Sequence, residues 1–186
     1  MTDARTPWSH PLRPADLHAR KPSRFSLTPA PEVLAALAED LGLLGLRKLR
    51  FEGEIRPRGR QDWQLEAMLG ATVVQACIVT TDPVTTRLDE PVARLWMAEM
   101  PDPGAGEVEM PEDDSIEPLP AVIDLGAVMH EALLLALPLY PRADGAELGA
   151  AEGTPPGAEP IAEETRNPFA GLGDMIRKRD GGDPSQ

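Results

Sequence analysis

The residues best suited to chemistry in this 186-residue chain are one cysteine and three histidines, and their placement argues against a metal centre. Cys77 opens the run Cys77-Ile-Val-Thr80, His10 and His18 lie in the N-terminal segment, and His130 lies much further along the chain. A zinc site needs three or four clustered ligands, and a single cysteine can form neither a multi-cysteine site nor an internal disulfide. We therefore expect no metal and no cofactor, and a buried, apolar Cys77 at the end of a strand.

A second candidate for chemistry is the pair His130-Glu131, because a histidine beside a carboxylate can transfer protons. Neighbouring residues on a helix do not face each other, so a solvated helix face is the simpler interpretation and a binding role for Glu131 the alternative. The acidic run Glu112-Asp113-Asp114 lies between prolines and is typical of a solvated loop. The chain has no phosphate-binding loop and no nucleophile elbow. We expect a protein that is not an enzyme, with a hydrolase or nuclease as the least favoured class.

Basic side chains cluster between residues 47 and 60, although the whole chain has a net charge of −13. On the exposed face of a hairpin they could contact RNA phosphates. The nearby aromatic residues, Phe51 and Trp63, fall on the core-facing register and are poorly placed to stack on bases. A charged sheet face, partly neutralised by the acidic residues of 99–117, is the competing interpretation. The candidate RNA-binding residues are Arg47, Lys48, Arg50, Arg56, Arg58 and Arg60.

The element with the clearest boundaries is a helix over 124–137. Asp124 is a good N-cap, because its carboxylate can accept hydrogen bonds from the free N–H groups of the first turn. Apolar residues then recur at helical spacing. Pro138 ends the helix, and Leu139 to Pro141 should continue in an extended conformation.

The rest of the ordered chain predicts an α+β fold with a mostly antiparallel sheet and two helices packed on one face. A helix over about 30–42 should open at Thr28 and stop at Gly42. Alternating residues predict a short strand at 24–27 and a hairpin of strands 46–55 and 63–73, joined by a turn at 57–60. A further strand over 84–97 should be interrupted at Glu90-Pro91.

Twenty-one prolines and sixteen glycines concentrate in three regions and divide the chain. We expect a flexible arm over 1–22, a folded domain over 23–142 with an acidic, structureless loop at 99–120, an acidic Pro/Gly linker over 143–166, and a short helical motif over 167–180. The first thirty residues carry no apolar run typical of a signal peptide, and the longest apolar run, 132–140, is too short to cross a bilayer. A single cysteine suits a reducing compartment, so we expect a cytoplasmic protein with no membrane contact.

The C-terminal motif, Asn167-Pro-Phe-Ala-Gly-Leu172, is the sharpest candidate for binding. Phe169, Leu172 and Ile176 have the spacing of one apolar helix face, and basic residues follow at 177–179. A helix this short is marginal alone, so it should dock, either on its own domain or in a groove of a partner protein. The sequence leaves both alternatives open.

The helix signature and the C-terminal motif together resemble the bacterial YceD family, over roughly residues 25–175. The residues that carry the resemblance are Asp124-Leu125, Glu131, Leu135-Ala136-Leu137-Pro138-Leu139, Pro141, Asn167-Pro168-Phe169-Ala170 and Leu172. In that family the turn after the strand often carries Cys-x-x-Cys, whereas this chain has Thr80 in the second position. This departure argues that the cysteine pair is not required for what the family does.

The resemblance implies a ribosome-biogenesis factor that supports synthesis, processing or stability of large-subunit (23S) ribosomal RNA, without a small-molecule substrate. We expect a non-enzymatic adaptor whose partner is a ribosomal protein, a ribonuclease or a pre-ribosomal particle. Direct contact with ribosomal RNA through the basic hairpin is the alternative. Phe169 should be the best anchor, while Asp124 and the prolines should set shape. The expected partner-binding residues are Asp124, Glu131, Pro138, Pro141, Asn167, Pro168, Phe169 and Leu172.

Overall fold

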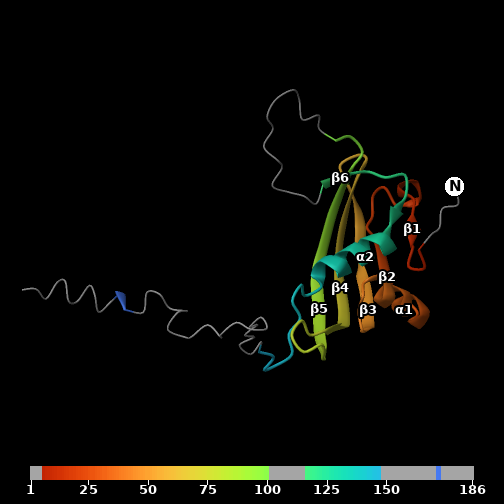
Figure 1. Ribbon diagram of the computed structural model, residues 1–186. Coiled ribbons are helices and arrows are strands. Elements are labelled where there is room, and N and C mark those ends of the chain that lie inside the picture. Colours follow the sequence, from red (N-terminus) through yellow and green to blue (C-terminus); the bar gives the residue numbers. More distant parts are fainter. Residues whose placement is uncertain (1–5, 101–115, 148–170, 173–186) are drawn as a thin grey trace, which may run out of the picture. The chain divides into compact units, whose positions relative to one another are not determined.

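The computed structural model describes residues 6–100, 116–147, 171 and 172. Met1–Ala146 form one unit and Glu147–Gln186 a second. The first unit is an α+β domain built on a five-stranded sheet in the order β2-β3-β4-β5-β6 (Figure 1). The expected fold class is therefore confirmed. The predicted linker and C-terminal motif lie almost wholly outside the described residues, as does 101–115 of the predicted acidic loop.

Three long strands form the centre of the sheet. β3 (Gly45–Arg58) and β4 (Asp62–Ala76) are the predicted antiparallel hairpin, and β5 (Pro83–Met97) pairs antiparallel with β4. The hairpin turn is shorter than expected, because Pro57 still pairs with Trp63 and Gly59, at φ +66°, begins the reversal. β2 (Ser23–Leu27) pairs antiparallel with β3 at one edge.

The predicted interruption at Glu90-Pro91 is wrong, since β5 runs unbroken and Pro91 pairs with Met68 of β4. A proline is tolerated in a strand that has a free edge, where its missing N–H costs no ladder hydrogen bond. Among the described residues β5 has such an edge at Pro91, because the neighbouring strand β6 (Ile116–Pro118) pairs with it only from Leu95 to Met97.

Short non-local strands were not predicted. β6 pairs parallel with β5 inside the segment expected to be structureless. β1 (Pro11–Leu12) pairs with β7 (Ile123–Asp124) in a second, two-stranded sheet. A short 3-10 helix over Pro14–Asp16 follows β1. The sequence predicts a flexible arm at 1–22, and the structure places residues 8–12 of it against the start of α2 (Leu125–Ala136).

Both helices lie on one face of the sheet, as predicted. α1 (Pro31–Asp40) begins after Ala30 rather than at Thr28, and Gly42, whose φ is +63°, directly follows its C-cap residue Leu41. The N–H of Leu43 bonds to the Ala38 carbonyl (2.8 Å) and that of Gly42 to Glu39 (3.2 Å), which closes the helix in a Schellman motif. α2 crosses the sheet over β4 and β5 (Figure 1).

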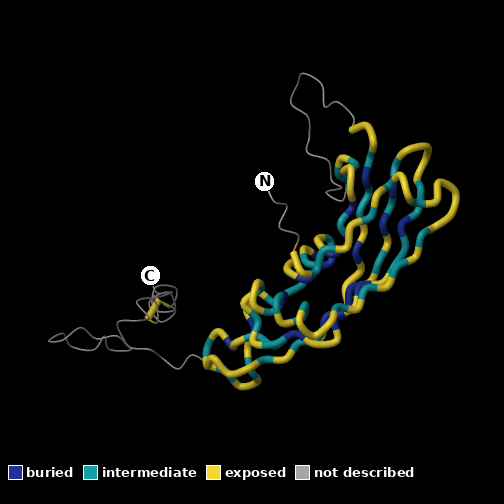
Figure 2. The backbone as a smooth tube through the Cα atoms, turned by 90° about the vertical axis from the view of Figure 1, so that its right-hand side faces the viewer, coloured by how far each residue is buried: buried dark blue, intermediate teal, exposed yellow. Residues whose placement is uncertain are grey.

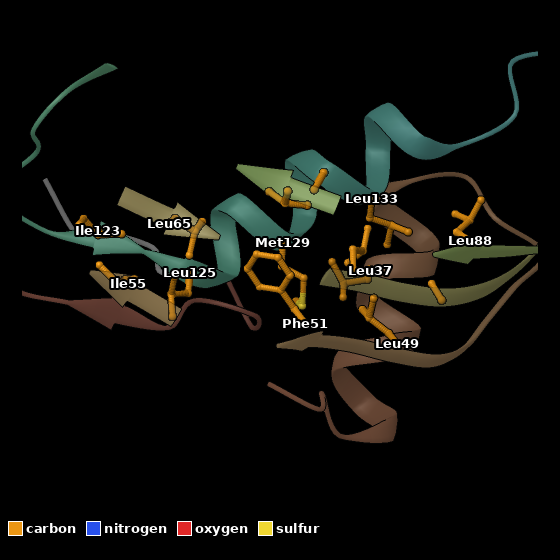
Figure 3. Packing of buried hydrophobic residues seen from close by; sticks show 14 of the residues in the cluster. Leu37, Leu49, Phe51, Ile55, Leu65, Leu88, Ile123, Leu125, Met129 and Leu133 are labelled. Atoms are coloured by element: carbon orange, nitrogen blue, oxygen red, sulfur yellow. The ribbon is translucent and has the colours of Figure 1, made fainter. Parts of the chain in front are cut away.

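The core lies between the helices and the inner face of the sheet. Leu37 of α1 and Met129 and Leu133 of α2 converge on Phe51 and Leu49 of β3 (Figure 3). All of these side chains are at most 2% exposed. The buried stretches lie within the strands, whereas the turns are exposed (Figure 2). The opposite, outer face of the sheet carries many polar and charged side chains together with the exposed Met68.

Candidate functional site

Asp124 fastens the start of α2 to the N-terminal segment. Its carboxylate accepts hydrogen bonds from the N–H groups of Gly126 (2.9 Å) and Ala127 (3.3 Å), which confirms the predicted N-cap. It also accepts from Ser9 Oγ (2.5 Å) and from the His10 N–H (2.7 Å). Partial burial raises the pKa of Asp124, but these hydrogen bonds outweigh it and hold the pKa below its usual value. Asp124 is therefore a structural junction with few lone pairs free for a partner.

The fit at this junction depends on a glycine. A Cβ at Gly126 would lie 1.8 Å from the Trp8 carbonyl oxygen, so a larger residue would displace the N-terminal segment. Trp8 also stacks on His130 with ring centroids 5.0 Å apart, and His130 Nε2 lies 2.8 Å from an Asp40 carboxylate oxygen of α1. The predicted solvated face holds only in part for His130, since Trp8 stacks on its ring and 24% of the side chain stays exposed.

Glu131 is exposed and takes part in an ion-pair chain. Arg94 of β5 donates to a Glu131 oxygen (2.7 Å) and lies 3.2 Å from a Glu117 oxygen of β6. Arg94 is the more buried member, with 17% of its side chain exposed. It therefore ties α2 to β5 and β6, and Glu131 can bind a partner only by sharing this arginine.

The C-terminal end of α2 and the segment that follows it leave apolar side chains in solvent. We call Leu134–Tyr140 the apolar segment. Leu135 is 73% exposed, Leu139 85% and Tyr140 75%. Large exposed apolar side chains that gather in one place mark interaction surfaces more often than single ones do. The apolar segment is thus the best candidate binding surface among the described residues.

Backbone contacts hold this segment in place. The Pro138 carbonyl accepts from Gln75 Nε2 (3.2 Å), and the Pro141 carbonyl accepts from the Ile78 N–H (3.0 Å). Pro141 is buried, whereas Ile78 is 48% exposed and extends the apolar surface. These two contacts fix the backbone at both predicted prolines.

A groove runs beside the apolar segment, between α2 and the free edge of β5. Its volume is about 330 Å3. Carboxylate and guanidinium groups of Glu90 and Arg94 border an otherwise apolar lining. The apolar lining consists of Pro91, Val92, Ala93, Ala132, Leu135 and Ala136.

The six predicted RNA-binding residues separate into three groups. Arg47, Lys48 and Arg50 lie at one end of β3 on the outer face of the sheet. Arg56 is paired with Glu54 and with Glu66 (3.0 Å) in the middle of that face. Arg58 and Arg60 lie at the hairpin tip, about 25 Å from Arg50 at the usual rise per residue of a strand.

Cys77 is buried at 1% exposure directly after β4, as predicted. Its Sγ accepts from the N–H groups of Val79 (3.4 Å), Thr80 (3.5 Å) and Ala143 (3.3 Å). The Thr80 side chain, followed by these backbone donors, lowers the pKa of Cys77 from 9.0 to about 6. Within the described ranges no group of three histidine, cysteine, aspartate or glutamate side chains could hold a metal ion.

Of the C-terminal motif, the structure describes only residues 171 and 172. Asn167, Pro168 and Phe169 lie outside the described residues, and Leu172 is described as 48% exposed. Sequence reasoning missed Arg87 and Arg94, which are isolated in strands and gain neighbours only through pairing. It also missed Trp8, which contacts α2 by stacking on His130. A single large apolar residue in an otherwise polar segment is the one signal in the sequence for such a contact.

Comparison with known proteins identifies the chain through one family model. Residues 65–175 match the model described as "Large ribosomal RNA subunit accumulation protein YceD", a range that begins in β4 and includes β5, α2 and the apolar segment. Searches of curated proteins and of solved structures return no match. No helix in the described parts has the length and apolar character needed to span a membrane. The match covers more than half of the chain, and the chain therefore belongs to the YceD family.

Proposed function

We propose that this protein supports the accumulation of large-subunit ribosomal RNA in the cytoplasm as a non-enzymatic adaptor that binds another protein of ribosome assembly. The partner is a ribosomal protein, a ribonuclease or a protein on a pre-ribosomal particle. One observation carries the proposal: Leu135, Leu139 and Tyr140 are each more than 70% exposed at one end of α2. The family description supports the process and says nothing of the surface.

The physical support lies in how the apolar segment is held. Burying an exposed leucine or tyrosine at an interface gains roughly 1.5–3 kcal/mol per side chain, and tyrosine is a frequent anchor of interfaces. The hydrogen bonds at Pro138 and Pro141 fix the backbone before binding, so less conformational entropy is lost when a partner docks. Asp124 fixes the other end of the same helix.

The test is a pull-down from native lysate with the full chain, washed at low and at high salt, with protein and RNA both identified. Leu139→Ser removes the most exposed apolar side chain of the segment. Val122→Ser is the matched control, because Val122 is 42% exposed near the opposite end of α2. We expect a ribosomal protein or a ribonuclease to survive high salt with wild type and Val122→Ser, and to be lost with Leu139→Ser. Equal recovery with all three would contradict the adaptor surface.

The same experiment addresses the C-terminal motif through Phe169→Ala. If the motif is the partner's handle, this variant loses the partner as Leu139→Ser does. If the motif docks on its own domain, Phe169→Ala keeps or strengthens the recovery of the partner. The assignment of Asn167, Pro168, Phe169 and Leu172 stays a prediction until then.

Direct contact with ribosomal RNA is the second candidate function. It is favoured by the placement of Arg47, Lys48 and Arg50 together on the outer face. Direct RNA contact predicts that large-subunit RNA is recovered at low salt and lost at high salt. The result should be the same for wild type and Leu139→Ser.

A further inference from the structure

We propose that Lys48, Arg50, Thr72 and Arg87 form a binding site for a backbone phosphate of RNA on the outer face of the sheet. The site deepens the RNA-contact candidate above and is independent of the adaptor surface. Only Lys48 and Arg50 belong to the basic cluster visible in the sequence. Thr72 and Arg87 join them from two further strands.

Strand pairing brings the four side chains together around a glycine. Arg50 of β3 pairs with Gly70 of β4, and Thr72 of β4 pairs with Arg87 of β5. A Cβ on Gly70 would lie 2.7 Å from Arg50 Nε and 2.7 Å from an Arg87 Nη atom. The two guanidinium groups therefore lean over Gly70 from opposite sides, in the space that a side chain would fill. The resulting recess has a volume of about 250 Å3.

A backbone irregularity adds the lysine. The register of β3 against β4 shifts between Arg47 and Arg50, and Lys48 adopts φ +52°. Residues other than glycine adopt this left-handed conformation infrequently, at a cost of roughly 1–2 kcal/mol. A bulge re-aims side chains relative to a regular ladder, and here Lys48 becomes part of the lining of the recess.

The charge balance favours an anion. Three basic side chains, Lys48, Arg50 and Arg87, line the recess, and the carboxylate of Asp89 is the acidic group that the structure pairs with Arg50 and Arg87. Arg87 Nε donates to Asp89 Oδ2 (2.8 Å) and an Nη atom to Oδ1, while Arg50 lies 3.7 Å from the same carboxylate. A guanidinium has five N–H donors, so Asp89 orients Arg87 and leaves other donors for a ligand. The hydroxyl of Thr72 can donate a further hydrogen bond.

The surroundings indicate a phosphate on a strand of RNA rather than a nucleotide held by its base. The four side chains that line the recess are charged or carry a hydroxyl group. Phe51, Trp63 and Trp96 belong to the buried core on the inner face. Contacts to phosphate without base stacking or base-edge hydrogen bonds carry no sequence information. We therefore expect weak, salt-sensitive and sequence-independent binding.

The experiment measures fluorescence anisotropy of short labelled single-stranded RNAs, of uniform and of mixed sequence, over a salt series with the full chain. Arg87→Gln should weaken binding of both RNAs about tenfold, the loss of one charge-assisted contact, and lower the salt slope by about one. Arg20→Gln removes the same charge at an exposed position before β2, outside the basic cluster of 47–60, and is the matched control. It should change the affinity much less.

Gly70→Ala gives a test without a change of charge. The new methyl group would occupy the space between Arg50 and Arg87 and push the guanidinium groups apart. The atoms that it meets are the ends of flexible side chains, so the fold should tolerate it. We expect a loss of RNA affinity similar to that of Arg87→Gln.

Three results would overturn the site. If Gly70→Ala and Arg87→Gln bind RNA no worse than Arg20→Gln, the site is wrong while the RNA-contact candidate stands. If wild type binds no RNA even at low salt, both fail and the adaptor proposal is untouched. If inorganic phosphate at the concentration of the RNA displaces it fully, the ligand is a free anion and not the RNA backbone.

Discussion

The two ends of α2 are built for different purposes. At the N-terminal end, Asp124 bonds to four donors and Gly126 lies against the Trp8 carbonyl, so each group is enclosed by its own chain. At the C-terminal end, Leu135 and Leu139 are more than 70% exposed. One end has its contacts satisfied within the domain, and the other leaves apolar surface without cover from described residues. The difference suggests that stability is concentrated at one end and recognition at the other.

A pair of identical substitutions two positions apart, on opposite sides of α2, should separate these purposes. Leu133 is fully buried against the sheet, and Leu133→Ala should lower the free energy of unfolding by about 2–5 kcal/mol through lost burial and a cavity. Leu135→Ala should change it by about 0.5 kcal/mol or less, because Leu135 is exposed. Urea denaturation of both variants is the measurement. A large loss in Leu135→Ala would show that the exposed end also supports the fold.

The next largest effect is expected at the N-cap. Asp124→Ala removes the cap and the anchor of Ser9 and His10, and should cost about 1–3 kcal/mol. The lowered pKa of Asp124 also gives the sign of the pH dependence. The stabilisation by ionised Asp124 is complete above the ordinary pKa of an aspartate. It is lost as pH falls through the lower pKa of Asp124 in the folded protein. Urea denaturation from neutral to acid pH should therefore show that the free energies of unfolding of wild type and Asp124→Ala converge at low pH. If this difference in free energy stays constant down to the lowest pH, the lowered pKa of Asp124 is contradicted.

The smallest effect concerns Cys77, which lies where the segment after α2 returns to β4. With a folded pKa of about 6, below the unfolded value of 9.0, the thiol should be ionised at neutral pH. The Cys77 thiolate then stabilises the folded state. This stabilisation is complete above the unfolded pKa and disappears as pH falls through about 6. Thiolate absorbance of the native protein should titrate near that pH, with Cys77→Ser as the blank. A titration above pH 8 would show that the backbone donors do not stabilise the anion.

Local signals explain what could be predicted from the sequence. Asp124 and Pro138 mark the ends of α2 by the chemistry of single residues, and Gly42 marks the end of α1 in the same way. The alternation in β3 and β4 identified the buried face of the hairpin. The bulge after Arg47 could not be predicted, since Leu46 and Leu49 satisfy burial only when the register shifts.

Non-local contacts explain what was missed or wrong. The strands β1, β6 and β7 have two or three residues each, too few for any periodicity, and exist through their partners. His130 is covered by Trp8, which lies more than a hundred positions earlier in the chain. At the candidate site, Leu134–Tyr140 has the composition of a core segment, so its exposure became visible only once α2 was placed on the sheet.

The burial of Cys77 provides a built-in reporter of local motion. The Ala143 N–H closes over its sulfur from beyond the apolar segment, while Ile78 holds the Pro141 carbonyl. A thiol reagent can reach the only cysteine in the chain only when this clasp opens. The rate of alkylation under native conditions therefore measures how often the segment detaches, and a partner that binds the apolar segment should slow that rate in proportion to its occupancy.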